Sequence, residues 1–222
     1  MHYVVLDIEM HPIEKKYTEE RKICVMETIE LGAVALDDKY NPVDEKKIYV
    51  HPDFCSELQN RYVDMTGITE SMLSTAPHFS EAIADFFGWC LGFDDDVEIL
   101  AWSNSDRHQI VSEMKLKQYV PDEREKKLID GWKDFQKEFT KLIGGGDVPR
   151  LDKAMDYAGL PFEGKQHDAL NDARNTAQLV ILARTDANTL RESAYARQKR
   201  DSGGCTLADI FDFSALFGDS SK

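Results

Sequence analysis

Two carboxylates interrupt an apolar segment close to the start of the chain. Residues 4–6 are Val-Val-Leu, and Asp7 and Glu9 follow with Ile8 between them. Because side chains alternate across a strand, both acids point to the same face, with their Cα atoms roughly 6.6 Å apart. Like charges on one buried face are unfavourable unless something neutralises them. A divalent cation facing both would do so, and carboxylate oxygens suit Mg²⁺ or Mn²⁺; alternatively, the strand ends at Leu6 and solvent meets both acids.

A second acidic cluster opens the last strong helical segment, residues 168–184. Asp168 is expected to cap this helix, whereas Asp172 borders a stripe of small residues where a helix can approach a sheet closely. A carboxylate at that position can reach the face of the first two acids. His167 precedes Asp172 by five residues, which would place the two about 140° apart within one helix. His167 therefore joins the site, as a proton acceptor, only if it stands at or before the helix start; otherwise it is an ordinary surface histidine.

A fifth candidate is Asp106, which follows a short apolar run and a polar turn, WSNSD. The carboxyl ends of strands are where α/β sheets place their ligands, so Asp106 is positioned to face a site there. The alternative is that Asn104 or Asp106 merely caps the helix that follows.

The elements that must position these side chains are indicated by hydrophobic periodicity. Three short strands with tight connections predict an antiparallel meander over residues 3–8, 28–36 and 46–50. Short apolar runs predict two further strands over residues 97–101 and 127–129. Helical spacing predicts helices over residues 79–91, 104–117, 132–143, 150–158 and 168–184. Strands that come first and then alternate with helices indicate an α/β fold with a mixed sheet.

Composition narrows the class of protein. The 222 residues carry a formal net charge of −14, which argues against a passive nucleic-acid binder but not against an enzyme that meets phosphates through metal ions. The four cysteines form no CxxC pair, so neither a zinc site nor a disulfide framework is expected. The expected compartment is a reducing cytoplasm. We expect no membrane association, because no apolar run approaches the length of a span and no secretory leader is recognisable.

The order Asp7-x-Glu9, then Asp106, then His167-x4-Asp172 strongly resembles the DEDDh family of 3′–5′ exonucleases, on the ribonuclease-H-like fold. Supporting segments are residues 27–34 (ETIELGAV), 65–69 (MTGIT) and 160–164 (LPFEG). The resemblance covers about residues 2–184. It implies an exonuclease domain over residues 1–184, with a mixed central sheet whose first three strands are antiparallel and which helices flank.

Two positions depart from the proofreading members of that family. Residues 102–106 (WSNSD) stand where those members carry a His-Asn-x-x-Phe-Asp motif. This segment is closer to the RNA-trimming branch of Eri-like and RNase T-like exonucleases. Met10-His11 replaces the Thr-Thr or Thr-Gly that often follows the first motif. Both departures bear on the substrate more than on the chemistry.

The resemblance implies a specific mechanism. Asp7, Glu9, Asp106 and Asp172 would hold two Mg²⁺ or Mn²⁺ ions roughly 4 Å apart. His167 would take a proton from the attacking water, and nucleoside 5′-monophosphates would leave the 3′ ends of single strands, with RNA favoured over DNA. The candidates for holding the 3′-terminal nucleotide are Met10, Thr66, Gly67 and Ile68; the alternative for them is plain core and turn packing.

The sequence leaves alternative functions and the role of the C-terminal segment undecided. One alternative is a DNA-directed exonuclease of the same family, and another is a nucleic-acid-binding member that has lost catalysis. The negative charge predicts a preference for single-stranded ends over long duplexes. Residues 185–222 form a tail that starts polar and basic and ends with an apolar-acidic stretch, residues 207–217. That stretch is expected to form a helix that docks on the domain, with a homodimer contact or a partner protein as alternatives.

Overall fold

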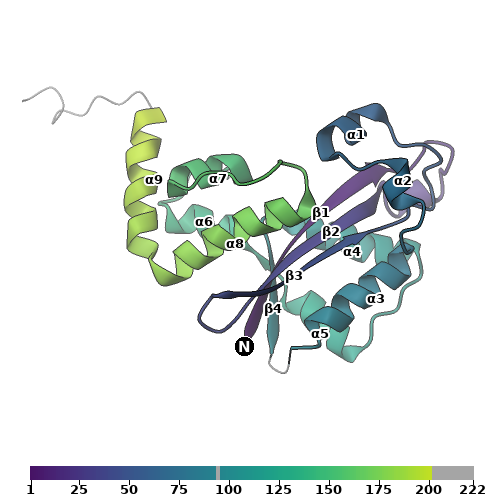
Figure 1. The fold of residues 1–222 in the computed structure, drawn as a ribbon, viewed down its shortest axis with the longest axis horizontal. Helices are drawn as coiled ribbons and strands as arrows, with labels where there is room; N and C mark the ends of the chain where they lie inside the picture. The colour runs from purple at the N-terminus through teal and green to yellow at the C-terminus, as the bar shows by residue number, and fades with distance from the viewer. Residues whose placement is uncertain (94–95, 202–222) are drawn as a thin grey trace, which may run out of the picture.

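The computed structural model describes residues 1–93 and 96–201, which form a sheet with helices on both faces (Figure 1). The strands are β1 (His2–Pro12), β2 (Met26–Leu36), β3 (Pro42–Tyr49), β4 (Val97–Ala101) and β5 (Lys133–Asp134). A short 3₁₀ helix, Glu20–Lys22, precedes β2. The α-helices are α1 (Asn60–Thr66), α2 (Glu70–Leu73), α3 (Phe79–Cys90), α4 (Asn104–Leu116), α5 (Glu123–Gly131), α6 (Phe135–Leu142), α7 (Leu151–Ala158), α8 (Ala169–Thr185) and α9 (Ala187–Asp201).

Strand β1 lies at the centre of the sheet, whose order is β3-β2-β1-β4-β5. β1 pairs antiparallel with β2 and parallel with β4, β2 pairs antiparallel with β3, and β4 pairs parallel with β5. Because helices cover both faces of β1, Val4, Val5 and Leu6 are all fully buried although they alternate between the faces. The predicted mixed α/β sheet, with its first three strands antiparallel, is confirmed.

Alternation along β1 separates two apolar cores. Val4 and every second residue after it pack with α3, α4 and α5 on one face, whereas Val5 packs with α6, α7, α8 and α9 on the other. Asp7 and Glu9 continue the Val5 face. The strand runs on to Pro12, so the alternative of an earlier strand end is wrong, and both acids belong to the sheet.

The predicted strand at residues 127–129 is wrong, because this segment lies within α5. The Asp122 carboxylate accepts hydrogen bonds from two N–H groups of the first turn, and the Glu125 carboxylate accepts one from the Asp122 N–H, which makes a capping box. Leu128 and Ile129 then turn inward as the apolar side of this helix. A short apolar run fits either a strand or a helix, and here the capping box at Asp122 favours the helix. The last strand of the sheet is instead Lys133–Asp134, which delays the start of α6 to Phe135.

The segment after residue 184 begins with a helix that packs on the domain. Leu190 and Ala194 of α9 are fully buried in the apolar cluster that also holds residues of α7 and α8, and α9 lies beside α7 (Figure 1). Residues 207–217 lie outside the described residues, so their docking role and the division near residue 184 stay predictions. Within residues 1–93 and 96–201, no helix combines the length and the apolar character that crossing a membrane requires.

Candidate active site

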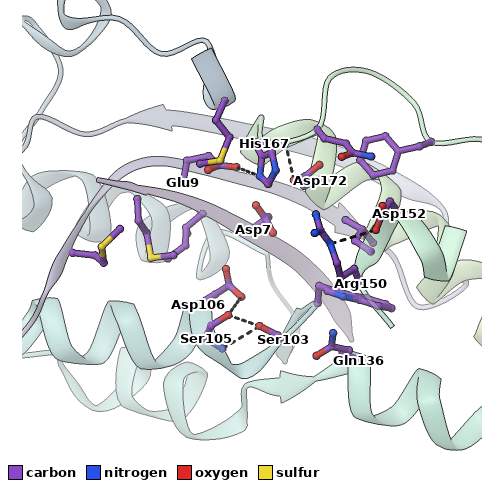
Figure 2. Close-up of a pocket in the computed structure, with 18 of the residues that line it drawn as sticks. Asp7, Glu9, Ser103, Ser105, Asp106, Gln136, Arg150, Asp152, His167 and Asp172 are labelled. Carbon is purple, nitrogen blue, oxygen red and sulfur yellow. Dashed lines mark hydrogen bonds and ion pairs between the residues drawn. The ribbon is translucent and has the colours of Figure 1, made fainter. Parts of the chain in front are cut away.

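The four acids and the histidine singled out in the sequence gather at one open cleft of about 470 Å³ (Figure 2). The cleft is lined by the second half of β1, the turn that follows β4, α1, and the starts of α4, α7 and α8. Figure 2 shows the Asp7 carboxylate at the centre, with Asp106 on one side and Glu9, His167 and Asp172 on the other. The fold therefore brings together every residue that sequence reasoning had proposed for metal binding and proton transfer.

Four consecutive residues of β1, Asp7 to Met10, line the cleft, and the strand is irregular within this segment. The pairing of β1 with β2 shifts register between Glu9 and Met10, and such a bulge re-aims the side chain that follows it. Glu9 is only 6% exposed, and Met10 lines the same cleft. One short segment of β1 therefore places both Glu9, a candidate metal ligand, and Met10, a candidate substrate contact, at the cleft.

Asp106 enters the site from the first turn of α4, directly after β4. Ser103 is the cap of this helix, since its hydroxyl accepts a hydrogen bond from the N–H of Ser105. Neither Asn104 nor Asp106 caps the helix, so the capping alternative for these two residues is wrong. Asp106 is 6% exposed and lines the cleft, which leaves its carboxylate available for other chemistry.

His167 stands before the start of α8, which resolves the five-residue spacing to Asp172. Asp168 caps α8 by accepting a hydrogen bond from the N–H of Asn171, as expected, and the helix begins at Ala169. His167 has a φ of 63°, a left-handed conformation that is uncommon outside glycine. This turn lets the His167 N–H donate to Asp172 Oδ2 at 3.1 Å. The imidazole Nδ1 lies 3.9 Å from Glu9 Oε1.

The close approach of α8 to the sheet depends on Gly32, which pairs with Asp7 across β1 and β2. A Cβ atom at Gly32 would lie 2.1 Å from the backbone N of Leu170 and 2.2 Å from the carbonyl carbon of Ala169. No real Cβ atom tolerates such distances, so the helix start rests on bare strand backbone. This contact explains why small residues line α8 beside Asp172, and it sets the depth of that carboxylate.

An ionic network with one buried member, Glu30, also holds the start of α8. Glu30, which is 1% exposed, accepts a hydrogen bond from the N–H of Ala169. Lys47 Nζ bridges Glu30 Oε1 at 2.6 Å and Asp168 Oδ2 at 2.7 Å. Lys47 thereby offsets a buried acid that would otherwise repel Glu9, its direct neighbour across the two strands.

Burial raises the pKa of all four clustered carboxyls, and repulsion within the cluster adds to it for Asp7 and Glu9. The pKa of Asp7 lies well above its ordinary value, through burial first and then through Asp106, Asp172 and Glu9. Burial, reinforced by neighbouring acids, raises the pKa of Glu9 to about 8. Burial likewise raises the pKa of Asp106 to about 7 and that of Asp172 to about 6. Raised carboxyl pKa values of this kind cluster at functional sites.

The donor set fits divalent cations that prefer oxygen. Ligand atoms of Glu9, His167 and Asp172 all lie within 4.8 Å of one another. Asp172 Oδ1 is buried and has no hydrogen-bond partner among the described residues. Four carboxylates, one with an orphaned oxygen, suit Mg²⁺ or Mn²⁺ and not a thiolate-seeking metal.

We expect Mg²⁺ or Mn²⁺ to raise the Tm of the protein, and to raise it more at about pH 8 than at about pH 5. The unfolded carboxyls titrate near pH 4, whereas Glu9 in the fold titrates at about 8. The folded protein therefore binds more protons in this window, and metal-free stability falls as the pH rises through it. At high pH the cations neutralise ionised carboxylates that repel one another. At low pH they must first displace the protons bound to these carboxyls. Equal shifts at both pH values, measured by differential scanning fluorimetry, would contradict a carboxylate metal site.

The candidate substrate contacts separate into two groups. Met10 lines the cleft, but Thr66, Gly67 and Ile68 are not among the residues that line it. The Thr66 hydroxyl donates to the Tyr62 carbonyl and accepts from the Ile68 N–H, and Gly67 closes α1 with a φ of 81°. Ile68 is 2% exposed in a small apolar cluster. These three residues shape the end of α1, and contact with a nucleotide stays a prediction for them.

Sequence reasoning missed most of the cleft walls. Tyr62 and Met65 of α1 form part of one wall, and residues around the start of α7 form part of another; the additional lining residues include Trp102, Ser103, Gln136, Arg150, Leu151, Asp152, Phe162 and Gln166. Met65, Trp102 and Phe162 stand inside segments already quoted for their resemblance to the family, which is the signal that could have identified them. The sequence around Arg150 carries no comparable signal.

Comparison with known proteins identifies a family model and a solved structure that resemble this chain. The family model RNase_T, described as Exonuclease, matches residues 4–180. The solved nuclease domain of 3′hExo, a DEDDh family member bound to rAMP, superposes with a TM-score of 0.70 at 20% identity, over 83% of this chain and 92% of that one. This likeness confirms the expected ribonuclease-H-like fold.

Curated relatives are similar over most of this chain but are longer proteins. DNA polymerase III PolC-type of Thermotoga petrophila is 29% identical over 180 residues, which cover 81% of this chain and 12% of the polymerase. The 3′-5′ exoribonuclease 1 of Homo sapiens is 23% identical over 179 residues, which cover 75% of this chain and 49% of that protein. The chain therefore spans half or less of the length of these relatives. It belongs to the RNase_T exonuclease family, whose model covers residues 4–180.

Proposed function

We propose that this protein removes nucleoside 5′-monophosphates from the 3′ ends of single-stranded nucleic acid, preferably RNA. The observation that carries the proposal is the meeting of Asp7, Glu9, Asp106 and Asp172 with His167 at one open cleft. Four acids with raised pKa, three of them buried and Asp7 half-buried, destabilise the fold unless cations meet them. A purely structural role would not concentrate this cost on the wall of a cleft.

In the proposed mechanism each side chain has a distinct task. Asp7, Glu9, Asp106 and Asp172 would hold two Mg²⁺ or Mn²⁺ ions, which when bound supply charge stabilisation for attack on the phosphodiester and for departure of the 3′-oxygen. His167 accepts the proton of the attacking water. Burial first, and then the charges of Arg150 and Lys165, lower the pKa of His167, so the imidazole is neutral and able to accept a proton near pH 7.

The preference for RNA is supported by the relatives and not by a contact in the cleft. The human relative is named an exoribonuclease, and the solved 3′hExo domain carries rAMP. A DNA-directed exonuclease is the second candidate, because the Thermotoga relative is a DNA polymerase. Discrimination requires recognition of the 2′-hydroxyl, which is the group that distinguishes the two substrates.

The deciding experiment compares 5′-labelled RNA and DNA strands of one sequence. We expect stepwise shortening from the 3′ end with Mg²⁺ or Mn²⁺, none with EDTA, and a higher kcat/KM on RNA. A higher kcat/KM on DNA would transfer the proposal to the second candidate. Metal binding without turnover on either strand would instead indicate a silent nucleic-acid-binding member.

His167→Ala should lower kcat by about 10²- to 10⁴-fold, the usual contribution of a positioned general base. The four carboxylates remain in this variant, so the rise in Tm on adding Mg²⁺ should persist. His78→Ala is a suitable control, since His78 is exposed and pairs with Asp53 instead of lining the cleft. Undiminished turnover in His167→Ala, measured on the labelled strand, would exclude the proposed base.

A further inference from the structure

His11 is a buried histidine that the proposed mechanism leaves without a role. It lies on β1 two residues beyond Glu9 and is 1% exposed. Its Nε2 atom accepts a hydrogen bond of 3.0 Å from the backbone N–H of Gln59. Because that nitrogen is the acceptor, the imidazole is neutral and carries its proton on Nδ1. A buried side chain that crosses between two segments in this way fixes their separation.

The partner of His11 is the residue at which α1 begins. Gln59 is the N-cap of α1 and makes no side-chain cap hydrogen bond, so the start of this helix depends on outside partners. The His11 ring also packs edge-on against the Tyr62 ring, with centroids 4.9 Å apart and an interplanar angle of 63°. One imidazole thus contacts α1 at its N-cap and again one turn later.

The α1 residues that follow this anchor face the cleft. Tyr62 and Met65 line it together with Met10. An aromatic ring and a thioether offer an apolar surface on which a nucleobase or a ribose can pack. The strand that carries Asp7 and Glu9 therefore also carries the attachment of this wall, two residues further along.

Apolar contacts hold the same segment independently of the imidazole. Leu58 and Ile68, on either side of α1, are buried with Ile29 and Leu73. The N–H of Leu58 also donates to the Glu70 carboxylate at 3.1 Å. Removing the His11 acceptor is therefore expected to loosen α1 locally without unfolding the domain.

We propose that His11 is a positioning residue that holds α1 against the catalytic strand, so that Tyr62 and Met65 form a ready-made wall for the 3′-terminal nucleotide. This inference rests on the proposed exonuclease function. Without the acceptor, the Gln59 N–H loses its protein partner, and α1 occupies displaced positions for part of the time. Substrate must then restore the wall, which raises the apparent KM in proportion to the lost fraction and leaves the bound complex unchanged.

The test compares His11→Leu with His11→Gln and with His51→Leu. Leucine fills the space without an acceptor, whereas the glutamine side-chain oxygen can accept from the Gln59 N–H. His51 is a matched control, because it is a partly buried histidine that bonds the Leu73 carbonyl and does not line the cleft. Steady-state kinetics on the labelled strand are measured together with hydrogen exchange of the peptide that covers residues 56–66.

His11→Leu should raise KM by about five- to tenfold, the equivalent of one hydrogen bond within the protein. Its kcat should stay within about twofold, and exchange at residues 59–66 should be faster. His11→Gln should restore the wild-type KM and the wild-type exchange rate, and His51→Leu should leave KM unchanged.

Different failures have different meanings. A lower kcat at unchanged KM in His11→Leu would indicate partial unfolding only and would overturn the positioning role. Unaltered exchange at residues 59–66 would overturn it as well. Wild-type protein that degrades no strand would overturn the proposed function instead, and the exchange result would still decide whether His11 anchors α1.

Discussion

Asp7→Asn is expected to abolish exonuclease activity and at the same time to stabilise the metal-free protein. Asp7 lies among three other acids, and its burial first and then their charges hold its pKa well above the ordinary value. Asparagine keeps the shape and removes one charge from this repulsion. The loss of a metal ligand should cost about 4 kcal/mol of transition-state stabilisation, which is roughly a 10³-fold lower kcat. The relief of repulsion should raise stability by about 1–2 kcal/mol, a Tm increase of roughly 2–8 °C.

Two measurements on purified Asp7→Asn distinguish a metal ligand from a structural acid. Labelled-strand assays give the turnover, and thermal unfolding with EDTA or with Mg²⁺ gives the two Tm values. The stabilising effect of Mg²⁺ seen in the wild type should shrink or vanish. Asp130→Asn is the control, since Asp130 lies on α5 with 81% of its side chain exposed. A variant of Asp7 that is both inactive and less stable would instead indicate an acid needed for folding.

Gly32→Ala is expected to damage the active site through packing alone, without altering any proposed catalytic residue. The added Cβ would lie 2.1 Å from the Leu170 backbone N, and backbone atoms cannot rotate away as a side chain could. Helix α8 must therefore move outward by about 1 Å, at a cost of about 1–3 kcal/mol or more. Asp172 and His167 move with it, and a misplacement of about 1 Å can lower turnover by roughly 10²-fold.

The matched control for this packing argument is Gly88→Ala. Gly88 lies inside α3, and a Cβ there meets nothing within 4 Å. Alanine at that position should stabilise the helix by about 0.5–1 kcal/mol, with turnover unchanged. Thermal unfolding and labelled-strand assays on both variants give the comparison. Wild-type turnover in Gly32→Ala would show that the start of α8 does not set the geometry of the site.

Much of the candidate site could be predicted from local pattern. The alternation along β1 is a property of any strand, so Asp7 and Glu9 had to share a face wherever the sheet placed them. The small residues around Asp172 indicated a helix that approaches the sheet closely, and Gly32 supplies the surface it approaches. The order of the acids and the histidine then pointed to the family that the RNase_T match shows.

The sequence by itself determined which side chains could do the chemistry, because residue type and strand or helix period are local properties. Only the tertiary structure decided how they meet. The wall formed by Tyr62 and Met65 and the anchor of α1 on His11 both depend on partners far away in the chain. The helix at residues 127–129 was missed for a related reason, since a short apolar run does not reveal its cap or its neighbours. Contacts between distant segments set loop conformation and depth of burial, and no local period encodes them.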